Sequence, residues 1–123
     1  MTKHAIIALD FDGVLHSAPN GYTGMEPEGD PVAGALDFVK AEIAKGTELV
    51  IYTARAAISG AAAVVAVDTW LRKHGFPYIP VVGNKPHADL YVDDRGYRFE
   101  GDFSALTDYL AENPVPSRWE KKA

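Results

Sequence analysis

The chain contains no cysteine, which excludes disulfide bonds, thiolate metal sites and cysteine nucleophiles together. Basic residues are also in the minority, with 12 Lys and Arg against 17 Asp and Glu and a formal net charge of −5. Because nucleic-acid binding usually needs a basic surface, we expect nucleic acid to be at most a substrate. The first apolar run, residues 5–9, is too short for a signal-peptide core or a membrane span. We therefore expect a cytoplasmic protein that has no membrane partner.

The composition that remains is that of a folded protein. Apolar residues make up 47% of the 123 residues and charged residues 24%, a balance typical of a soluble globular chain. This length favours one domain, which we place over residues 1–112. Residues 113–123 carry two prolines and mixed charge and are expected to form a loosely held tail, in which Trp119 either packs on the body or anchors an oligomer.

Short apolar runs alternate with segments of helical periodicity along most of the chain. The runs predict strands over residues 5–9, 49–52, 79–82 and 90–92, and a last short strand over 97–99. The helical segments are expected to begin after caps at Asp30, Ser59 and Asp102, with Pro31 as the first residue of the first helix. This alternation predicts an α/β protein with a three-layer Rossmann-like fold, in which a mostly parallel sheet carries helices on both faces.

Small or acidic polar residues follow three of these strands. Asp10 and Asp12 follow the first strand, Thr53 follows the second, and an acidic pair at 93–94 follows the fourth. Ligands of open α/β sheets bind outside the carboxyl ends of the strands, so these residues should converge if the three strands are neighbours. Several carboxylates in one crevice imply a hard cation with oxygen ligands, and Mg²⁺ is the usual one. Lys85, in the loop before the fourth strand, can reach the same place.

These residues resemble the motifs of the haloacid dehalogenase-like (HAD) phosphohydrolases. Residues 10–15, Asp-Phe-Asp-Gly-Val-Leu, are similar to the first motif, Thr53 to the second, Lys85 to the third, and Asp93 with Asp94 to the fourth. The ordered set spans most of the chain. The loop over residues 16–29 and the segment between Thr53 and Lys85 are too short for an inserted cap, so the chain resembles a minimal, capless member. Such proteins tend to act on large substrates or to borrow a lid from a partner subunit.

The resemblance implies a phosphatase that works through an aspartyl-phosphate. Asp10 would be the nucleophile, and Asp12 would protonate the leaving oxygen and then activate water. Thr53 and Lys85 would hold the phosphoryl oxygens, and Arg55, two residues past Thr53, is a weaker candidate for contact with the substrate. The substrate is expected to be a phosphorylated small molecule or macromolecule.

The resemblance also implies a magnesium site. Mg²⁺ would be held by the Asp10 carboxylate, by the backbone carbonyl of Asp12 and by Asp93, with Asp94 a direct or water-mediated ligand. The metal would screen Asp10 from an anionic substrate.

Two other functions stay open from the sequence. The chain could be a phospho-accepting module like a response-regulator receiver, although the Asp-x-Asp spacing and the position of the acidic pair after the lysine disfavour this. It could also be a binding protein that keeps the HAD fold without activity. A homo-oligomer is possible in each case. His16 and Tyr22 are expected in the loop over the site.

Overall fold

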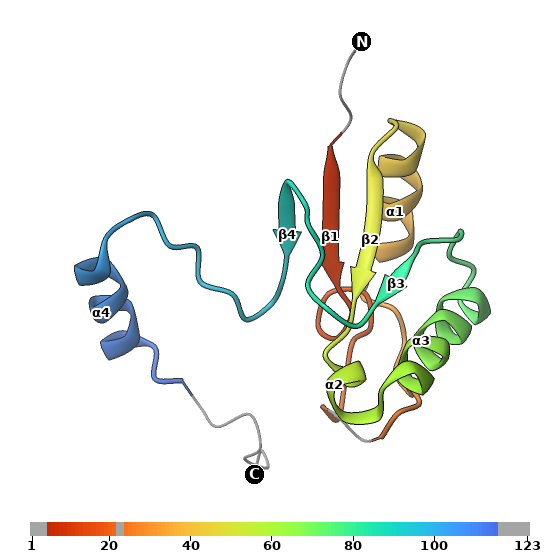
Figure 1. The fold of residues 1–123 in the computed structure, drawn as a ribbon, viewed down its shortest axis with the longest axis horizontal. Helices are drawn as coiled ribbons and strands as arrows, with labels where there is room; N and C mark the ends of the chain where they lie inside the picture. The colour runs from red at the N-terminus through yellow and green to blue at the C-terminus, as the bar shows by residue number, and fades with distance from the viewer. Residues whose placement is uncertain (1–4, 22–23, 116–123) are drawn as a thin grey trace.

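The computed structural model of the chain describes residues 5–21 and 24–115 (Figure 1). The elements in chain order are β1 (Ile6–Asp10), α1 (Ala35–Ala44), β2 (Glu48–Tyr52), α2 (Arg55–Ser59), α3 (Ala61–Lys73), β3 (Val81–Val82), β4 (Leu90–Val92) and α4 (Phe103–Glu112). Among the described residues, no helix has the length and apolar character needed to cross a membrane.

The four strands form one parallel sheet in the order β3-β2-β1-β4. β1 is a central strand, and its residue Leu9 pairs with Ile51 of β2 on one side and with Val92 of β4 on the other. The predicted Rossmann-like α/β fold is therefore confirmed. The neighbours that the site requires, β1 with β2 and β4, are also present.

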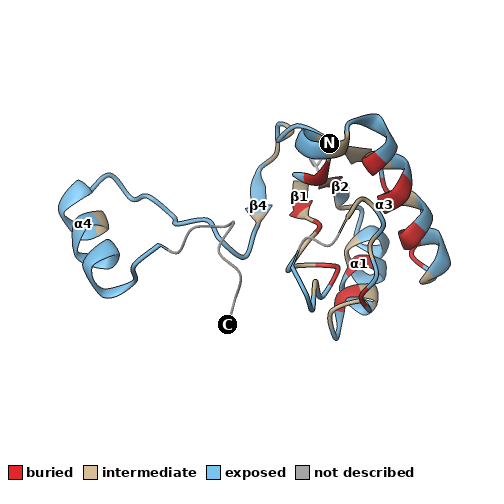
Figure 2. Cartoon of the chain, turned by 90° about the horizontal axis from the view of Figure 1, so that it is seen from below, coloured by how far each residue is buried: buried red, intermediate tan, exposed pale blue. Residues whose placement is uncertain are grey.

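The two longer helices of the core cover the same face of this sheet. Leu9 and Ile51 point to one face and belong to one buried core. Val39 of α1 and Val67 of α3 belong to the same core, so both helices pack on that face (Figure 2). The reason is topological, because two right-handed crossovers that step in the same direction, β1 to β2 and β2 to β3, place both helices on one side.

The opposite face is reached by the connection from β3 to β4, which contains no helix. The hydroxyl of Tyr91 on β4 donates to the carbonyl of Pro86 at 2.7 Å, which holds this connection against the strand. We expected helices on both faces; in the described chain this loop stands where the second helical layer was predicted.

The first predicted helix begins later than its sequence signals suggest. Asp30 and Pro31 do not start α1: the Asp30 carbonyl accepts a bond from the N–H of Ser17 at 2.9 Å, and Pro31 pairs with His16 in an isolated bridge. These contacts close the base of the long loop, and α1 starts only after Gly34, which has a φ of 86°. The cap-like residues are used to close a loop because the returning chain offers backbone partners to them.

Two further boundaries also differ from the predictions. Ser59 ends the short helix α2 rather than capping a long one, because Gly60 with φ 64° and ψ −149° interrupts the helix before α3. Residues 97–99 form no strand. The cap at Asp102 is confirmed, since its carboxylate accepts from the N–H of Ala105 at 3.1 Å.

The last helix lies apart from the sheet. α4 contacts no other helix or strand of the described chain, and an exposed segment separates it from β4 (Figures 1 and 2). Residues 113–115 of the predicted tail are exposed. Tyr22 and Trp119 lie outside the described residues.

Candidate functional site

Three carboxylates meet at the carboxyl end of the sheet. Asp10 is the last residue of β1, and Asp93 and Asp94 follow β4 directly. Because β1 and β4 are parallel neighbours, their ends are adjacent, and one oxygen from each carboxylate lies within 4.8 Å of the others. The described chain therefore contains an acidic cluster, Asp10, Asp93 and Asp94, that could hold a metal ion.

The charge on Asp10 is poorly compensated in the protein alone. Burial raises the pKa of this carboxyl, and the negative charges of Asp93, Asp94 and Asp12 raise it further. A hydrogen bond of 2.8 Å from the Phe11 N–H opposes the shift, but the net result raises the pKa of Asp10 from 3.8 to about 7. A divalent cation with oxygen ligands would relieve this repulsion, so the donor set fits the expected metal.

Asp93 has partners of its own. Its Oδ1 accepts from the N–H groups of Arg95 at 2.6 Å and Gly96 at 3.0 Å, and its Oδ2 accepts from the Tyr52 hydroxyl at 3.2 Å. Burial works to raise the pKa of Asp93, but these bonds and the charge of Lys85 together lower it. Burial and the charges of Asp93 and Asp10 raise the pKa of Tyr52, so its hydroxyl keeps its proton and acts as a donor.

Tyr52 was not identified from the sequence, although the pairing pattern contains the signal. Asp10 and Tyr52 are partners in the register of β1 and β2, and paired residues of parallel strands point to the same face. An aromatic hydroxyl beside Asp10 follows directly from that register, once the strand pairing is known.

Glycine at position 13 lets Asp94 approach the first motif. Gly13 has a φ of 83°, a conformation that other residues rarely adopt. A side-chain carbon at this position would also collide with the Asp94 carboxylate. The glycine of the Asp-x-Asp-Gly sequence is thus required twice, by the backbone turn and by the acidic residue from the other strand.

The Asp12 carboxylate does not join the acidic cluster. Its Oδ2 accepts from Arg55 Nε at 2.8 Å, and its Oδ1 accepts from Arg55 Nη2 at 2.9 Å. His16 Nδ1 lies 2.8 Å from the same Oδ1. We expected Asp12 among the metal ligands through its backbone carbonyl, and that expectation stays a prediction. The side chain belongs instead to a separate group, which we call the Asp12 network: Asp12, His16 and Arg55.

His16, expected in the loop over the site, is a buried core residue. Only 1% of its surface is exposed, and its ring stacks on Phe11 with centroids 5.2 Å apart. The Gly29 N–H donates to Nε2 at 2.8 Å, so the neutral ring must carry its proton on Nδ1 and donate it to Asp12. The imidazole therefore links the first motif to the end of the long loop.

Arg55, the weaker candidate for contact with the substrate, is buried and hydrogen-bonded within the protein; its role toward a substrate stays a prediction. It is 2% exposed, and beyond Asp12 it donates from Nη1 to the carbonyls of Gly24 at 2.7 Å and Met25 at 3.3 Å. A bidentate, charge-assisted bond to a carboxylate is one of the strong pairings of a guanidinium, and Arg55 makes it with Asp12. In this arrangement Arg55 ties α2 to the first motif and the long loop.

The two predicted phosphate ligands lie near the same end of the sheet. Thr53 follows β2 directly and is buried, and its Oγ1 accepts from the Arg55 N–H at 3.1 Å. An accepting hydroxyl still has its own proton to donate. Lys85 places its Nζ 4.2 Å from the centroid of the Tyr91 ring, close enough to Asp93 to lower the pKa of that carboxyl. Lys85 thus lies beside the acidic cluster, and Thr53 lies at the end of the neighbouring strand β2.

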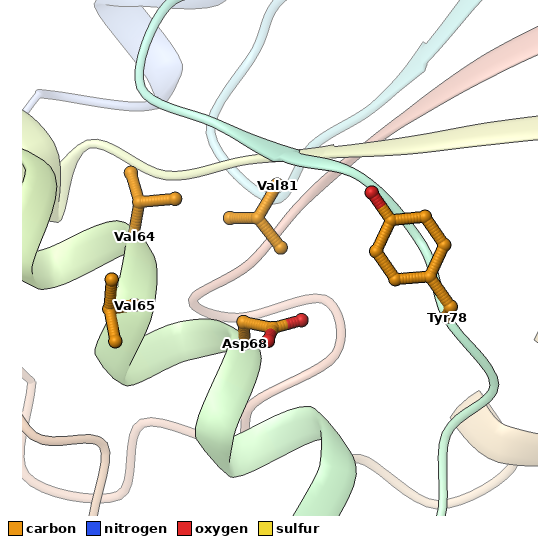
Figure 3. Close-up of a pocket in the computed structure, with 5 residues that line it drawn as sticks. All are labelled: Val64, Val65, Asp68, Tyr78 and Val81. Carbon is orange, nitrogen blue, oxygen red and sulfur yellow. The ribbon is translucent and has the colours of Figure 1, made fainter.

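A shallow hollow of about 280 Å³ lies elsewhere, between α3 and the chain leading into β3 (Figure 3). Val64, Val65 and Asp68 of α3 line it together with Tyr78 and Val81. None of these residues belongs to the acidic cluster. Asp68, its only acidic residue, lies 3.5 Å from Arg72, so this hollow is not the candidate site.

Comparisons with known proteins give the fold and no family. No family model matches the chain, and no curated protein matches it. A solved structure described as a conserved protein from Bacteroides thetaiotaomicron matches at 18% identity with a TM-score of 0.60, covering 92% of this chain and 94% of that one. Because β4 ends at Val92, the match extends past the sheet into the C-terminal segment. At this identity the likeness supports the fold alone.

Proposed function

We propose that the chain is a metal-dependent phosphomonoester hydrolase of the HAD type, with Asp10 as the nucleophile and Mg²⁺ as the metal. The observation that carries this proposal is the acidic cluster, in which Asp10 meets Asp93 and Asp94 from a separate strand. Burial, together with the negative charges of Asp93 and Asp94, raises the pKa of Asp10, so a cation bound at this cluster would stabilise the ionised carboxylate. Oxygen donors select a hard cation, and the bound metal would supply charge neutralisation for an anionic substrate.

In this proposal, named residues of the chain carry out each step of the reaction. A carboxylate oxygen of Asp10 forms a bond to phosphorus while the bond from phosphorus to the ester oxygen breaks. The Lys85 ammonium and the Thr53 hydroxyl hold the phosphoryl oxygens, and the leaving oxygen takes up a proton. Water then attacks phosphorus, the bond to Asp10 breaks, and inorganic phosphate leaves with the carboxylate regenerated.

The Asp12 network sets a condition on this reaction. Asp12 can give a proton to the leaving oxygen, or take one from water, only if its carboxylate turns away from Arg55 and His16. We infer that this rearrangement accompanies substrate binding in the hydrolase. If it does not occur, the acyl phosphate on Asp10 forms without efficient hydrolysis, and the observed network therefore favours a phospho-accepting module as the second candidate.

The experiment measures turnover and the covalent intermediate together. The chain is incubated with p-nitrophenyl phosphate with and without Mg²⁺, and product release is followed. The hydrolase predicts magnesium-dependent turnover that falls by roughly 10⁴-fold or more in Asp10→Asn, which removes the nucleophile and keeps the shape. Asp37→Asn, on the exposed surface of α1, is the matched control and should retain full activity.

The second measurement separates the alternatives. The chain is labelled with ³²P-acetyl phosphate, and hydroxylamine-labile label is counted. Label that accumulates on the wild type, is absent from Asp10→Asn and does not turn over supports the phospho-acceptor. Magnesium binding with neither label nor turnover supports an inactive binding protein and contradicts both catalytic proposals.

A further inference from the structure

The C-terminal part of the chain forms an apolar surface that contacts no other helix or strand among residues 5–21 and 24–115. α4 places Phe103, Leu106 and Leu110 on one side, at helical spacing, and none of its residues is buried. Phe103 is 72% exposed. Two aromatic residues ahead of the helix pack on it, Phe99 against Phe103 with centroids 4.8 Å apart and Tyr97 against Tyr109 at 4.9 Å. We call residues 97–112 the C-terminal arm.

The arm cannot owe its helix to these contacts alone. A helix of ten residues is marginal in water, and helices of this length usually depend on packing of their apolar face. The aromatic contacts within the arm leave Tyr97, Phe99 and Tyr109 exposed as well. An apolar face of this extent on one helix is typical of an interaction surface.

A groove of matching character lies on the body of the protein. It has a volume of about 400 Å³ and lies beside α1, over the strands β1 and β4. Its lining is apolar apart from Glu42 and includes Ile7 and Leu9 of β1, Leu90 of β4 and Phe38 of α1. Leu90 and Phe38 are both exposed. α1 packs mainly over β2, so no helix of the described chain covers β4 on this face of the sheet.

The path of the chain carries the arm away from this groove. Directly after β4, the Asp93 carboxylate accepts from the N–H groups of Arg95 and Gly96 and so fixes a turn at the strand end. The chain then runs through exposed residues to α4, which lies far from α1 and from the sheet in both views (Figures 1 and 2). Within the described part of the chain, neither the groove nor the arm is covered by another element, and a turn and an extended hinge lie between them.

We propose that this groove receives α4 from a second copy of the chain, and that the two copies exchange their arms symmetrically. Each copy supplies one helix and one groove, so a single two-fold arrangement covers both apolar surfaces and closes the assembly. Phe103, Leu106 and Leu110 fill the space between α1 and β4, and residues 95–101 act as the hinge. The proposal concerns assembly and holds whether or not the chain is a phosphatase.

The absence of cysteine from the chain makes a direct test possible, because every disulfide must join introduced residues. Phe38→Cys marks the groove and Leu106→Cys marks the arm. The two single variants are unfolded, mixed, refolded together and oxidised mildly. Arm exchange predicts a covalent dimer in the mixture and none in either variant alone. In Asp108→Cys, which lies on the opposite side of α4, the covalent dimer should fall at least tenfold.

Light scattering on cysteine-free chains and a double cysteine variant complete the test. Light scattering should give a dimer for the wild type, and Leu110→Asp should shift its midpoint of dissociation at least tenfold upward, with circular dichroism confirming that the core remains folded. The double variant Phe38→Cys/Leu106→Cys distinguishes where the arm docks. A monomer with an internal disulfide would overturn the proposal in favour of docking within one chain. A dimer that survives Leu110→Asp and forms no crosslink, or a monomeric wild type, would also overturn it.

Discussion

Two aspartates of the first motif, two positions apart, lie in opposite electrostatic surroundings. Asp10 faces Asp93 and Asp94, has one backbone donor, and its pKa is raised to about 7. Asp12 receives two bonds from a buried guanidinium and one from an imidazole. The end of the strand accounts for the difference, because Asp10 is the last residue of β1 while Asp12 lies beyond the strand end, where it contacts Arg55 of α2 and His16.

The comparison shows how one short motif can serve two purposes. In the acidic cluster the Asp10 carboxylate is only weakly compensated by the protein, and a bound cation would balance its charge, as expected of a binding site. The Asp12 network is balanced by the protein itself and joins three separate segments, which is the property of a structural tie. The following changes break one arrangement or the other, and their effects should differ in size and in pH dependence.

The largest effect is expected where the balanced arrangement is broken. Arg55→Gln removes the guanidinium, so Asp12 keeps only its bond with His16, and the carbonyls of Gly24 and Met25 lose the Arg55 donor. We expect the free energy of unfolding to fall by about 3 kcal/mol, a value at the low end for a buried pair because Asp12 is 34% exposed. Urea unfolding measures this change.

Arg72→Gln is the matched control, because Arg72 pairs with Asp68 on the exposed side of α3 at 3.5 Å. It should cost less than about 0.5 kcal/mol. In the double variant Arg55→Gln/Asp12→Asn, the loss should be smaller than the sum of the single losses. Additive losses would mean that the pair is not energetically coupled, and the tie would be refuted.

The second expected effect is a gain in the free energy of unfolding on Asp10→Asn, and its size depends on pH. The pKa of Asp10 is about 7 in the folded chain and 3.8 without its surroundings, so between these values the folded state binds more protons than the unfolded state. The contribution of Asp10 to the free energy of unfolding of the metal-free protein must therefore fall as pH rises from about 4 to about 7. Asp10→Asn removes this loss and should stabilise the metal-free protein at pH 8 by about 2 kcal/mol, after allowance for solvent screening.

Paired unfolding curves at pH 4 and pH 8, recorded in a chelator, measure this difference. At pH 4 the wild type and Asp10→Asn should be nearly equal in stability, because the Asp10 carboxyl is protonated there in the folded state. Asp37→Asn, on the exposed surface of α1, should leave the pH slope of the wild type unchanged. A variant no more stable than the wild type at pH 8 would show that Asp10 is not under repulsion.

The sequence predicted most of the framework around this comparison. Apolar runs gave the strands, and their order placed the ends of β1, β2 and β4 together, because parallel neighbours end at one edge. The boundaries that failed depended on contacts distant in sequence. Pro31 looked like a helix start but pairs with His16, and residues 97–99 looked like a strand but have no neighbouring strand to pair with.

The candidate site also has a part that the sequence predicts and a part that it does not. Position at strand ends predicted the acidic cluster, since backbone topology alone brings Asp10 to Asp93 and Asp94. It could not predict the Asp12 network, because the direction of a side chain beyond the strand end is set by its neighbours. Arg55 could have faced solvent, substrate or a carboxylate, and only the fold of the loop that supplies Gly24 settles the choice.

The third expected effect is stabilisation by Mg²⁺, whose positive charge would compensate the acidic cluster but not the Asp12 network. Under our proposal, Mg²⁺ at about ten times its dissociation constant should stabilise the wild type by about 1.4 kcal/mol at pH 8. The gain should shrink at pH 5.5, since protons on Asp10 compete with the metal. Thermal unfolding with and without Mg²⁺ measures it. Asp94→Asn should lose most of the gain and Asp37→Asn none; equal gains in all three proteins would place the metal elsewhere.

The smallest effect is expected at the cation that stands beside the acidic cluster. Lys85 is exposed and lies over the Tyr91 ring at 4.2 Å, whereas Arg55 is buried and bidentate, so the two cations should differ greatly in their contribution to stability. Lys85→Met should change the free energy of unfolding by about 0.5 kcal/mol. If Lys85 holds the phosphoryl group, the same variant should nonetheless weaken inhibition by inorganic phosphate by roughly tenfold, because that bond is charge-assisted. A large loss of stability with unchanged phosphate inhibition would reverse the assignment and make Lys85 a second structural tie. Thr53 would then be the one remaining candidate ligand for the phosphoryl oxygens.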